Sequence, residues 1–598
     1  MRISNVKIKN YRNLRDVDVD LTNIVGIIGP NNGGKSNFIK AITLPFLSDE
    51  TGFVKKNLSW LDINGAAKNS YYNYIIENFS DIRSGQIDKT EFISMLPIVS
   101  VQITLEAKEL EEYFVRHLSY AICDDKIKYG IKYEFAPKNG NEILNNIREI
   151  FSTMELKDLS IDKMKMNLLP TNLYEYRIIV PLRESSVGYD TLKYFKCSSL
   201  IAERDDFSRT NDKMGSNALV SILQNKLDVK SKLEIEIEYS NFFQKLKNLS
   251  DMNDIINWQE KTELKNATDF FNEINIVPNM PSMYSLLNSV RLGYSGETLS
   301  LQGLGYRNLV LLFVLINSLL INKNEASLSI LTIEEPEAHL CINNERLLVS
   351  YIKNFVSDND TVQLLYTSHS TDFINKFGLD NILIFNNGNG ISLKTELDEK
   401  QRNYLAKIPN LDLFKLFFSK KCILVEGVTE ELLIRSYLDS EKNINEIQVI
   451  SFHKGYIAIL DIWLKINKEN SNKIGIIRDY DMEQKAKDEH EEYNSYKNVC
   501  VQTTKTRTLE TEIVDTETNY EILKKYFEGK YSWNVSDKLE LSQKWCNSKA
   551  SVMLELCRDL QNGEISGFTL PRHIAQVLHF LTKSDDEDMK EEKECNEN

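Results

Sequence analysis

Alternating and continuous apolar runs in the first part of the chain predict a strand, loop and helix unit. Val6–Asp20 alternates apolar and polar positions in two short runs, which predicts a β-hairpin. Ile24–Ile28 is a continuous apolar run and predicts a buried strand. A glycine-rich loop follows it, and we expect a helix to begin at Lys35.

Further along, the pattern predicts two kinds of region. A strand is expected at Ile98–Leu105, after a segment rich in Asn, Ser and Tyr, and residues 206–275 are helical and highly charged. No heptad is sustained there, so an inserted helical module is favoured over a coiled coil. A buried helix in Leu309–Ile321 then leads to strands at Ser329–Ile333 and Thr361–Tyr366.

The pattern restarts beyond about residue 405. Four apolar runs are separated by helical stretches, a β/α alternation that predicts a second, smaller parallel-sheet domain. The four runs lie at 421–427, 447–452, 472–479 and 498–504.

Composition narrows the class of protein. Of 598 residues, 42% are hydrophobic and 27% are charged, as in globular proteins, and the net charge of −15 argues against a broadly basic protein that coats nucleic acid. Residues 584–598 are strongly acidic and are expected to form a disordered tail. No apolar run is long enough to span a membrane, and the eight cysteines form no CxxC pair. We therefore expect a cytoplasmic protein with reduced thiols, no membrane partner and no zinc site.

Gly29–Ser36 reads GPNNGGKS and fits the P-loop pattern G-x-x-x-x-G-K-[ST] between a strand and a helix. Backbone N–H groups in such a loop surround phosphates at the positive end of the helix dipole. Lys35 is expected to reach the β and γ phosphates of ATP, and the Ser36 hydroxyl to bind Mg²⁺. We expect Asn32, Gly34 and Asn37 to contact the nucleotide as well.

An apolar strand that ends in two acids follows about 300 residues later. Ile330–Glu335 has the form of a Walker B motif, with Glu334 holding the Mg²⁺ shell and Glu335 polarising the attacking water. The usual first acid is Asp, so the longer Glu334 side chain leaves the metal geometry open.

Two neighbouring segments strengthen this interpretation. Leu299–Gly305 resembles an ABC signature, in which Ser300, Gln302 and Gly303 meet a phosphate at a helix start. Thr367–Ser370 follows a strand and resembles the switch loop, with His369 as the γ-phosphate sensor.

The order of these motifs resembles the SMC/RecF-like branch of ABC ATPases. In that branch the signature of one subunit completes the nucleotide site of another, which implies a homo-oligomer, as a dimer or a tetramer. The start Asn10–Leu14 also matches the branch, and Arg12 is expected to lie near the nucleotide. The position of the Q-loop glutamine stays open, with Gln102 as one candidate.

Acids follow two strands of the second domain. Glu426 ends a strand and precedes a glycine turn and a first helical turn with Glu430, while Asp479 and Asp481 follow another strand. Two acids at i and i+2 point the same way, so three or four carboxylates are expected at one sheet edge. Such a cluster suits Mg²⁺, and Mn²⁺ is an alternative.

The pattern LVEG-x-TE followed by DxD resembles the TOPRIM domain. Joined after an ABC ATPase, it resembles the OLD (overcoming lysogenization defect) family of ATP-dependent endonucleases, over nearly the whole chain. The family implies a late metal-binding acid, which Glu510 matches, and a lysine near the scissile phosphate, which Lys549 matches; Lys544 is the alternative.

The resemblance implies an α/β chain of several parts. The ABC ATPase domain takes 1–205 and 276–405, the helical dimerisation module 206–275, the TOPRIM nuclease domain 406–583 and the acidic tail 584–598.

The implied activity is two-metal hydrolysis of double-stranded DNA in anti-phage defence. One ion is assigned to Glu426 and Asp479, the other to Glu430, Asp481 and Glu510, with Lys549 offsetting charge on the phosphate. Members of the family act alone, with a helicase, or with a reverse transcriptase and its RNA, and ATP either permits or restrains cleavage.

Two rival functions stay open. One is a RecF-like DNA-binding ATPase scaffold with an inactive TOPRIM domain; retention of the four acids argues against it. A topoisomerase needs a nucleophilic tyrosine in a further domain for which little chain remains, and a primase more typically brings a zinc ribbon. No histidine lies in the TOPRIM motifs, so His453 and His573 are expected to be structural or surface residues.

Overall fold

The computed structural model describes most of the chain, in two compact units. One unit comprises Met1–Gly26 and Ser36–Phe377, and the other comprises Ile27–Lys35 and Gly378–Asn598. The described residues are 1–46, 56–123, 126–156, 160–200, 213–249, 282–287, 290, 292–294, 296–321, 327–407, 413–417, 419–440, 447–452, 456–468, 471–516 and 518–583.

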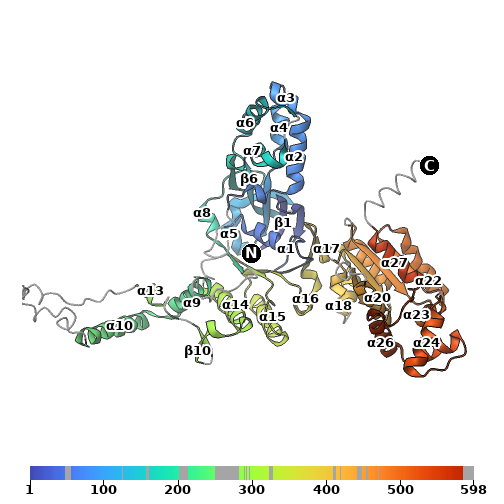
Figure 1. Cartoon of the computed structure of the whole chain (residues 1–598). Helices are drawn as coiled ribbons and strands as arrows, with labels where there is room; N and C mark the ends of the chain where they lie inside the picture. Colours follow the sequence, from blue (N-terminus) through green and yellow to red (C-terminus); the bar gives the residue numbers. More distant parts are fainter. Residues whose placement is uncertain are drawn as a thin grey trace, which may run out of the picture. The chain divides into compact units, whose positions relative to one another are not determined.

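An antiparallel sheet of six strands stands at the start of the first unit (Figure 1). Its order is β2-β1-β4-β6-β5, with β7 beside β6. Alternate residues of β1, such as Val6 and Ile8, are fully buried, which is why the polar-apolar alternation predicted the hairpin. The strands are β1 (Arg2–Tyr11), β2 (Leu14–Asp20), β4 (Val99–Glu106), β5 (Ser119–Cys123), β6 (Lys126–Pro137) and β7 (Tyr174–Ile179).

Helices inserted between these strands form a group of their own, in which α3 and α4 both contact α6 (Figure 1). They are α2 (Gly65–Glu77), α3 (Phe79–Ser84), α4 (Lys89–Met95), α6 (Gly140–Ser152) and α7 (Ile161–Leu168), with the short helices α5 (Glu112–Val115) and α8 (Tyr189–Leu192) nearby in sequence.

The P-loop strand belongs to a second six-stranded sheet of order β14-β13-β3-β12-β11-β8. Every residue of β12 is buried, and so is every residue of β11 before Glu334, which explains their continuous apolar runs. The strands are β3 (Ile24–Ile28), β8 (Phe195–Leu200), β11 (Leu328–Glu334), β12 (Val362–Thr367), β13 (Ile382–Asn386) and β14 (Asn389–Ser392).

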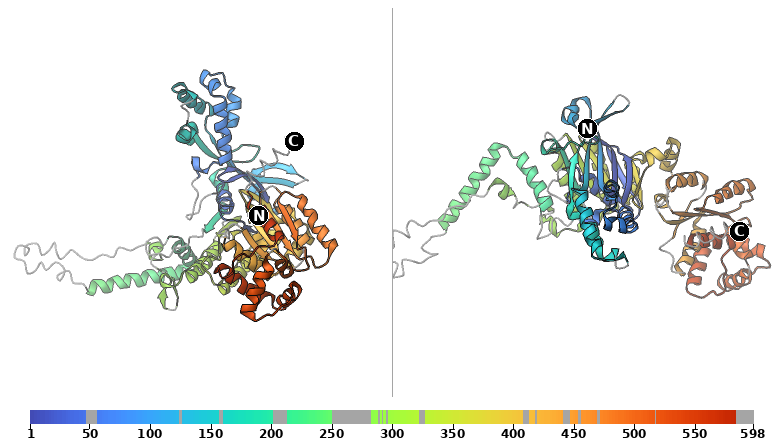
Figure 2. Two further views of the ribbon diagram at one scale, coloured as in Figure 1. Left: turned by 45° about the vertical axis from the view of Figure 1, so that its right-hand side comes forward. Right: turned by 90° about the horizontal axis from the view of Figure 1, so that it is seen from above.

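The helices of this region include the predicted P-loop helix and the predicted buried helix. Helix α9 packs against α14, and α10 extends away from both (Figures 1 and 2). The helices are α1 (Lys35–Thr43), α9 (Lys213–Lys226), α10 (Val229–Leu249), α13 (Met283–Leu287), α14 (Leu304–Ile321), α15 (Ile342–Ser357) and α16 (Thr371–Phe377), and β9 (Gly293–Tyr294) pairs with β10 (Glu297–Thr298).

The predicted second parallel sheet has the order β16-β15-β17-β18, with every neighbouring pair parallel. Its strands are β15 (Lys421–Val425), β16 (Ile447–Ser451), β17 (Lys473–Arg478) and β18 (Val499–Thr503). Because parallel strands end at the same edge, the residues after β15 and β17 are neighbours.

The helices of the second unit fill its core with large side chains such as Trp463 and Trp545, both fully buried. They are α17 (Leu393–Glu396), α18 (Glu399–Lys407), α19 (Leu413–Leu416), α20 (Val428–Ser440), α21 (Tyr456–Ile466), α22 (Gln484–Glu491), α23 (Leu509–Asp515), α24 (Asn519–Tyr531), α25 (Lys538–Cys546), α26 (Lys549–Gln561) and α27 (Arg572–Thr582).

The expected strand at 98–105 is confirmed as β4, and the four later runs are confirmed as β15 to β18. The sequence analysis did not assign β5 to β8 or the β13–β14 hairpin. The 206–275 region is helical at α9 and α10. Residues 206–212 and 250–275, the 584–598 tail and His453 lie outside the described residues. In the described part of the chain, no helix is long and apolar enough to cross a membrane.

Strand β17 and helix α27 approach each other closely at a glycine. A Cβ on Gly475 would lie 2.2 Å from Val577 Cγ1, so only glycine leaves room for α27 on this strand. The contact holds the C-terminal helix against the strand that leads to Asp479.

Gly475→Ala is therefore expected to destabilise the second unit by about 1–3 kcal/mol through overpacking. Scanning calorimetry should show a lower unfolding temperature for the transition of this unit. Gly529→Ala on α24 is the matched control, because its added Cβ meets no atom within 4 Å apart from its chain neighbours and the backbone of its own helix, and alanine favours the helix. Equal unfolding temperatures for Gly475→Ala and wild type would contradict the close packing.

Candidate functional site

The P-loop lysine is held inside its own loop. Lys35 is buried, and its Nζ donates hydrogen bonds to Gly29 O at 2.7 Å and Pro30 O at 3.0 Å. Asn32 has a φ of 62° and Gly34 a φ of 119°, so the loop uses left-handed backbone at both positions. Positive φ values of this kind allow successive backbone N–H groups to point toward one phosphate.

A hairpin that the sequence analysis missed packs against this loop. A Cβ on Gly29 would lie 2.0 Å from the carbonyl oxygen of Phe385 at the end of β13, and Gly388 N donates to Gly33 O at 2.9 Å. The signal was present, because Asn387 and Gly388 both have positive φ and form the Asn-Gly turn typical of tight hairpins.

The two predicted Mg²⁺ ligands of the ATPase motifs are in contact. Ser36 Oγ on α1 donates a hydrogen bond to Glu334 Oε2 at the end of β11, over 3.0 Å. The residues are 298 positions apart in sequence, so only the sheet order brings them together.

Glu335 and His369 also face each other, with His369 Nε2 3.9 Å from Glu335 Oε1. Both side chains are about 40% exposed (40% for His369 and 43% for Glu335), so they are open to solvent. The backbone of Glu335 has a φ of 43°, and its N–H donates to both the carbonyl and the hydroxyl oxygen of Thr367. These bonds hold the acid in an otherwise unfavourable conformation.

A third acid of the Ile333–His339 segment was missed. Glu337 Oε1 accepts hydrogen bonds from Ser368 Oγ at 2.9 Å and from His369 N at 2.7 Å. Burial raises the pKa of Glu337. Glu337 positions the His369 loop through residues that follow a strand about 30 positions later. The sequence pattern does not show that these two segments are neighbours.

Arg12 is in the turn between β1 and β2 and reaches the P-loop helix. Its φ is 50°, its guanidinium forms an ion pair with Asp62 at 2.9 Å, and its Nη1 donates to Asn37 Oδ1 at 3.0 Å. Arg12 therefore lies at the start of α1, beside predicted nucleotide contacts.

The signature-like segment forms the approach to α14. Gln302 Nε2 donates a weak hydrogen bond to Glu297 Oε2 at 3.4 Å, and Gly303 is exposed before the first turn. The side chain of Ser300 lies outside the described residues. Gln102, the candidate Q-loop residue, is on β4 in the antiparallel sheet, opposite Lys7 and Lys132.

The acids of the second unit meet at the carboxyl edge of β15 and β17. Asp479 N donates to Glu426 Oε2 at 3.3 Å, across the two strand ends. Glu430 is buried on the first turn of α20, and its Oε2 accepts bonds from Gly427 N at 3.0 Å and Thr429 Oγ1 at 3.1 Å.

Glu510 and Lys549 are brought together by α23 and α26. Lys549 Nζ lies 3.1 Å from Glu510 Oε2, and Glu510 is fully buried. Within the described part of the chain, Glu510 Oε1 has no hydrogen-bond partner. The alternative lysine, Lys544, instead donates to Asn534 O and forms an ion pair with Glu540.

Electrostatics show that the acids share one space. Burial, followed by the negative charges of Glu430, Glu426 and Glu510, raises the pKa of Asp479 to about 8, and Lys549 opposes this shift. Burial also raises the pKa of Glu430, and the charge of Glu510 acts in the same direction. One lysine cannot neutralise four carboxylates, so the set has the chemistry of a divalent-cation site.

Among the described residues, no group of three or more His, Cys, Asp or Glu side chains is arranged to hold a metal ion. Asp481 has a φ of 47° and donates its N–H to Arg507 O at 3.3 Å. The donor types and the unsatisfied oxygen of Glu510 fit a metal, but the predicted ligand sets need to move closer to share one.

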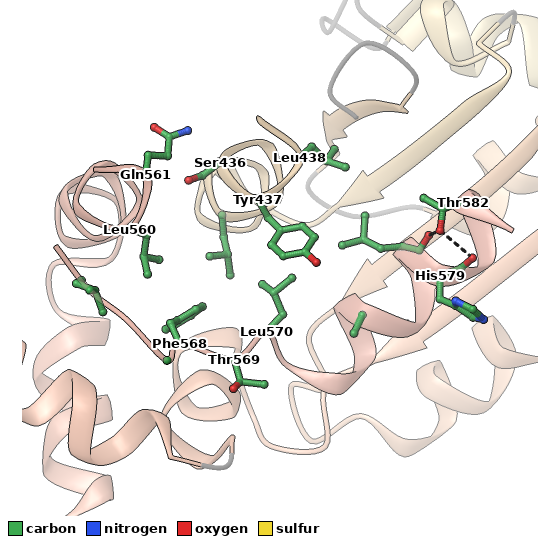
Figure 3. Close-up of a pocket in the computed structure, with 15 residues that line it drawn as sticks. Ser436, Tyr437, Leu438, Leu560, Gln561, Phe568, Thr569, Leu570, His579 and Thr582 are labelled. Carbon is green, nitrogen blue, oxygen red and sulfur yellow. Dashed lines mark hydrogen bonds between the residues drawn. The ribbon is translucent and has the colours of Figure 1, made fainter. Parts of the chain in front are cut away.

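A cavity of about 750 Å³ lies elsewhere in this unit, between α20, α26 and α27 (Figure 3). It is lined by side chains such as Tyr437, Phe568 and Leu570, and none of the predicted acids lines it. Its lining is mixed polar and apolar, and it includes no Asp, Glu, Lys or Arg side chain. His573, on α27, is buried with no hydrogen-bond partner for either ring nitrogen among the described residues, so of the two expected alternatives, structural or surface, it is not a surface residue.

Comparison with known proteins matches the two parts of the chain to two different families. The family described as "AAA ATPase domain" matches residues 1–374, and the family described as "Overcoming lysogenization defect protein-like, TOPRIM domain" matches residues 417–481. The chain is 21% identical over 489 residues to Endonuclease GajA of Bacillus cereus (strain HuB5-5), covering 74% of this chain and 68% of that protein.

SMC head domains are among the solved structures that match. The Smc head domain with an extended coiled coil, bound to the C-terminal domain of ScpA derived from Pyrococcus furiosus, is 13% identical with a TM-score of 0.30, over 68% of this chain and 99% of that chain. The SMC head domain from Thermotoga maritima is 12% identical with a TM-score of 0.27, over 66% and 99%. At these scores the two likenesses add nothing to the assignment.

The predicted order of an ATPase followed by a TOPRIM domain is confirmed by the two family matches. Domains of these two types use a nucleotide and a divalent metal. The chain belongs to the AAA ATPase domain family and, with its OLD-like TOPRIM domain, is an OLD-family ATPase–TOPRIM protein.

Proposed function

We propose that this protein is an ATP-regulated, metal-dependent endonuclease that cuts double-stranded DNA in anti-phage defence. The observation that carries the proposal is the set of buried acids with Lys549 at the carboxyl edge of β15 and β17. The name of the relative, Endonuclease GajA, agrees with it, and the defence role rests on the OLD-family resemblance.

In this proposal Glu426, Glu430, Asp479, Asp481 and Glu510 hold Mg²⁺ or Mn²⁺. Divalent ions at such a site activate the attacking water and stabilise the leaving oxygen. Lys549 lies 3.1 Å from Glu510, where its ammonium group can offset negative charge on the scissile phosphate. Gly427 N and Thr429 Oγ1 orient Glu430. Glu430, Asp479 and Glu510 are buried, whereas Glu426 and Asp481 are partly exposed.

The nucleotide site follows the same reasoning. We assign ATP to the P-loop, with Lys35 on the phosphates and Asn32, Gly34, Asn37 and Arg12 around them. Ser36 and Glu334 hold the Mg²⁺, Glu335 polarises water and His369 senses the γ phosphate; the Ser36–Glu334 and Glu335–His369 distances are compatible with these roles. Ser300, Gln302 and Gly303 of a second chain complete the site, and residues 206–275 join the chains.

One observation favours a second candidate function, a DNA-binding ATPase scaffold with an inactive TOPRIM domain. No group of three acids is arranged for a metal among the described residues. The nuclease is preferred because acids at neighbouring strand ends, with Glu510 paired to Lys549, supply the oxygen donors that Mg²⁺ prefers.

Cleavage of DNA distinguishes the two functions. Wild-type protein is incubated with supercoiled and linear DNA, Mg²⁺ or Mn²⁺, with and without ATP, and nicked and cut products are measured on gels. Glu426→Ala should lower the rate by more than about 100-fold, since even outer-shell partners of a metal cost 10–100-fold. Lys35→Ala should lose the response to ATP while keeping metal binding.

The exposed Glu521→Ala on α24 is the matched control and should cleave like wild type. No cleavage by wild type under any condition would refute the nuclease, and religated topoisomers would indicate a topoisomerase instead.

The pKa of Asp479 predicts a pH dependence. Because its folded pKa is about 8 and the ordinary value is 3.8, the metal-free folded state holds a proton that the unfolded chain has lost. This group's contribution to stability is present below about pH 4 and is lost as pH rises to about 8. Metal binding needs the ionised form, so the thermal stabilisation by Mn²⁺ should grow from about pH 6 to about pH 8.5.

Calorimetry across this pH range tests the prediction. Asp479→Asn should flatten the metal-free pH dependence and remove most of the Mn²⁺ stabilisation, whereas Asp515→Asn, at a half-exposed ion pair, should change neither. The same pH profile in Asp479→Asn and wild type would be incompatible with the assignment.

A further inference from the structure

A short basic loop borders the acids of the second unit. Residues 504–508 join β18 to α23, and α23 carries Glu510 at its second position. Along this loop Lys505 and Arg507 are exposed, whereas Thr504 is buried and Thr506 and Thr508 are half-buried. Two cationic side chains are therefore exposed on a loop that ends at the acid cluster.

Backbone contacts fix the loop beside the segment with Asp479. Thr504 N donates to Arg478 O at 3.0 Å, and Tyr480 N donates to Thr504 Oγ1 at 2.9 Å. Further along, Asp481 N donates to Arg507 O at 3.3 Å. The loop thus runs alongside residues 478–481, at the carboxyl edge of β17 and β18.

A buried acid makes the loop rigid. Glu512 Oε2 accepts three hydrogen bonds, from Lys505 N at 3.0 Å, Thr506 N at 2.9 Å and Thr506 Oγ1 at 3.0 Å. Thr504 Oγ1 also donates to Thr506 O at 2.8 Å. With the backbone and threonines turned inward, the positions at which Lys505 and Arg507 leave the loop are fixed.

Lys505 and Arg507 form no ion pair with the described residues. In the described part of the chain, no carboxylate forms an ion pair with Lys505 or Arg507, although the protein has 87 acids and 72 Lys and Arg residues. A DNA strand carries one negative charge per phosphate, so cationic side chains next to the acids favour its binding there. Lysine and arginine are the residues that contact nucleic-acid phosphates without regard to sequence.

We propose that Lys505 and Arg507 bind backbone phosphates of the DNA strand next to the scissile phosphate. This inference rests on the proposed nuclease function and adds the surface by which the substrate is held. Since phosphate contacts carry no sequence information, the loop positions any DNA strand on the acids without selecting a sequence.

The test is the salt dependence of DNA binding. Binding of a fluorescein-labelled DNA duplex to the full-length protein is measured by anisotropy, with Ca²⁺ replacing Mg²⁺, over a range of salt concentrations. Lys505→Ala/Arg507→Ala should lower the slope of log affinity against log salt by about 1.8, because each lost contact to duplex DNA removes about 0.9. The KM for DNA cleavage should rise about tenfold with little change in kcat.

Two variants control for charge and folding. Lys525→Ala/Arg572→Ala removes the same two charges from exposed positions on α24 and α27, and should bind like wild type. Lys505→Arg/Arg507→Lys keeps both charges and should retain the wild-type slope.

The outcomes separate this inference from the nuclease proposal. A lower slope in the loop variant alone establishes the phosphate contacts, even if wild type cleaves nothing, in which case only the nuclease proposal fails. If wild type cleaves DNA and the loop variant keeps the wild-type slope and KM, Lys505 and Arg507 are ordinary solvated charges and the inference is overturned.

Discussion

Like charge held in a buried space is the constraint on which the second unit depends. The parallel sheet places Glu426 and Asp479 at neighbouring strand ends, and α20 and α23 add Glu430 and Glu510. Burial and repulsion together raise the pKa of Asp479 to about 8, with Lys549 as the countercharge that opposes the shift. A fold that keeps such a set is stabilised by a divalent ion and destabilised without one.

The first unit also gathers its candidate groups at the ends of parallel strands. Glu334, at the end of β11, accepts a hydrogen bond from Ser36 of the P-loop helix. Glu337 accepts one from His369 N and so fixes the backbone of that loop. In each unit, therefore, the functional groups stand just beyond the ends of buried parallel strands. Side chains from distant parts of the sequence meet there because the sheet order, rather than the chain, makes them neighbours.

The sequence predicts those helices and strands that a local pattern of residues marks. The strand Ile24–Ile28 and the helix start at Lys35 agree with the structure, because a continuous apolar run marks the first and a glycine-rich loop marks the second. The β13–β14 hairpin carried a readable Asn-Gly turn, but its packing on Gly29 depends on residues more than 350 positions away. The roles of Glu337 and Glu512 could not be predicted either, since a buried acid is recognised only by the groups that donate to it.

The central claim is that the second unit binds a divalent ion through its buried acids, and Mn²⁺ binding followed by electron paramagnetic resonance tests it most directly. The nucleotide-free protein is titrated alongside Glu510→Gln and Ser36→Ala. The account predicts bound Mn²⁺ in wild type and in Ser36→Ala, and loss of bound Mn²⁺ in Glu510→Gln. The reason is that the wild-type Glu510 carboxylate is fully buried and its Oε1 has no hydrogen-bond partner among the described residues. Equal Mn²⁺ binding in Glu510→Gln and wild type would contradict it.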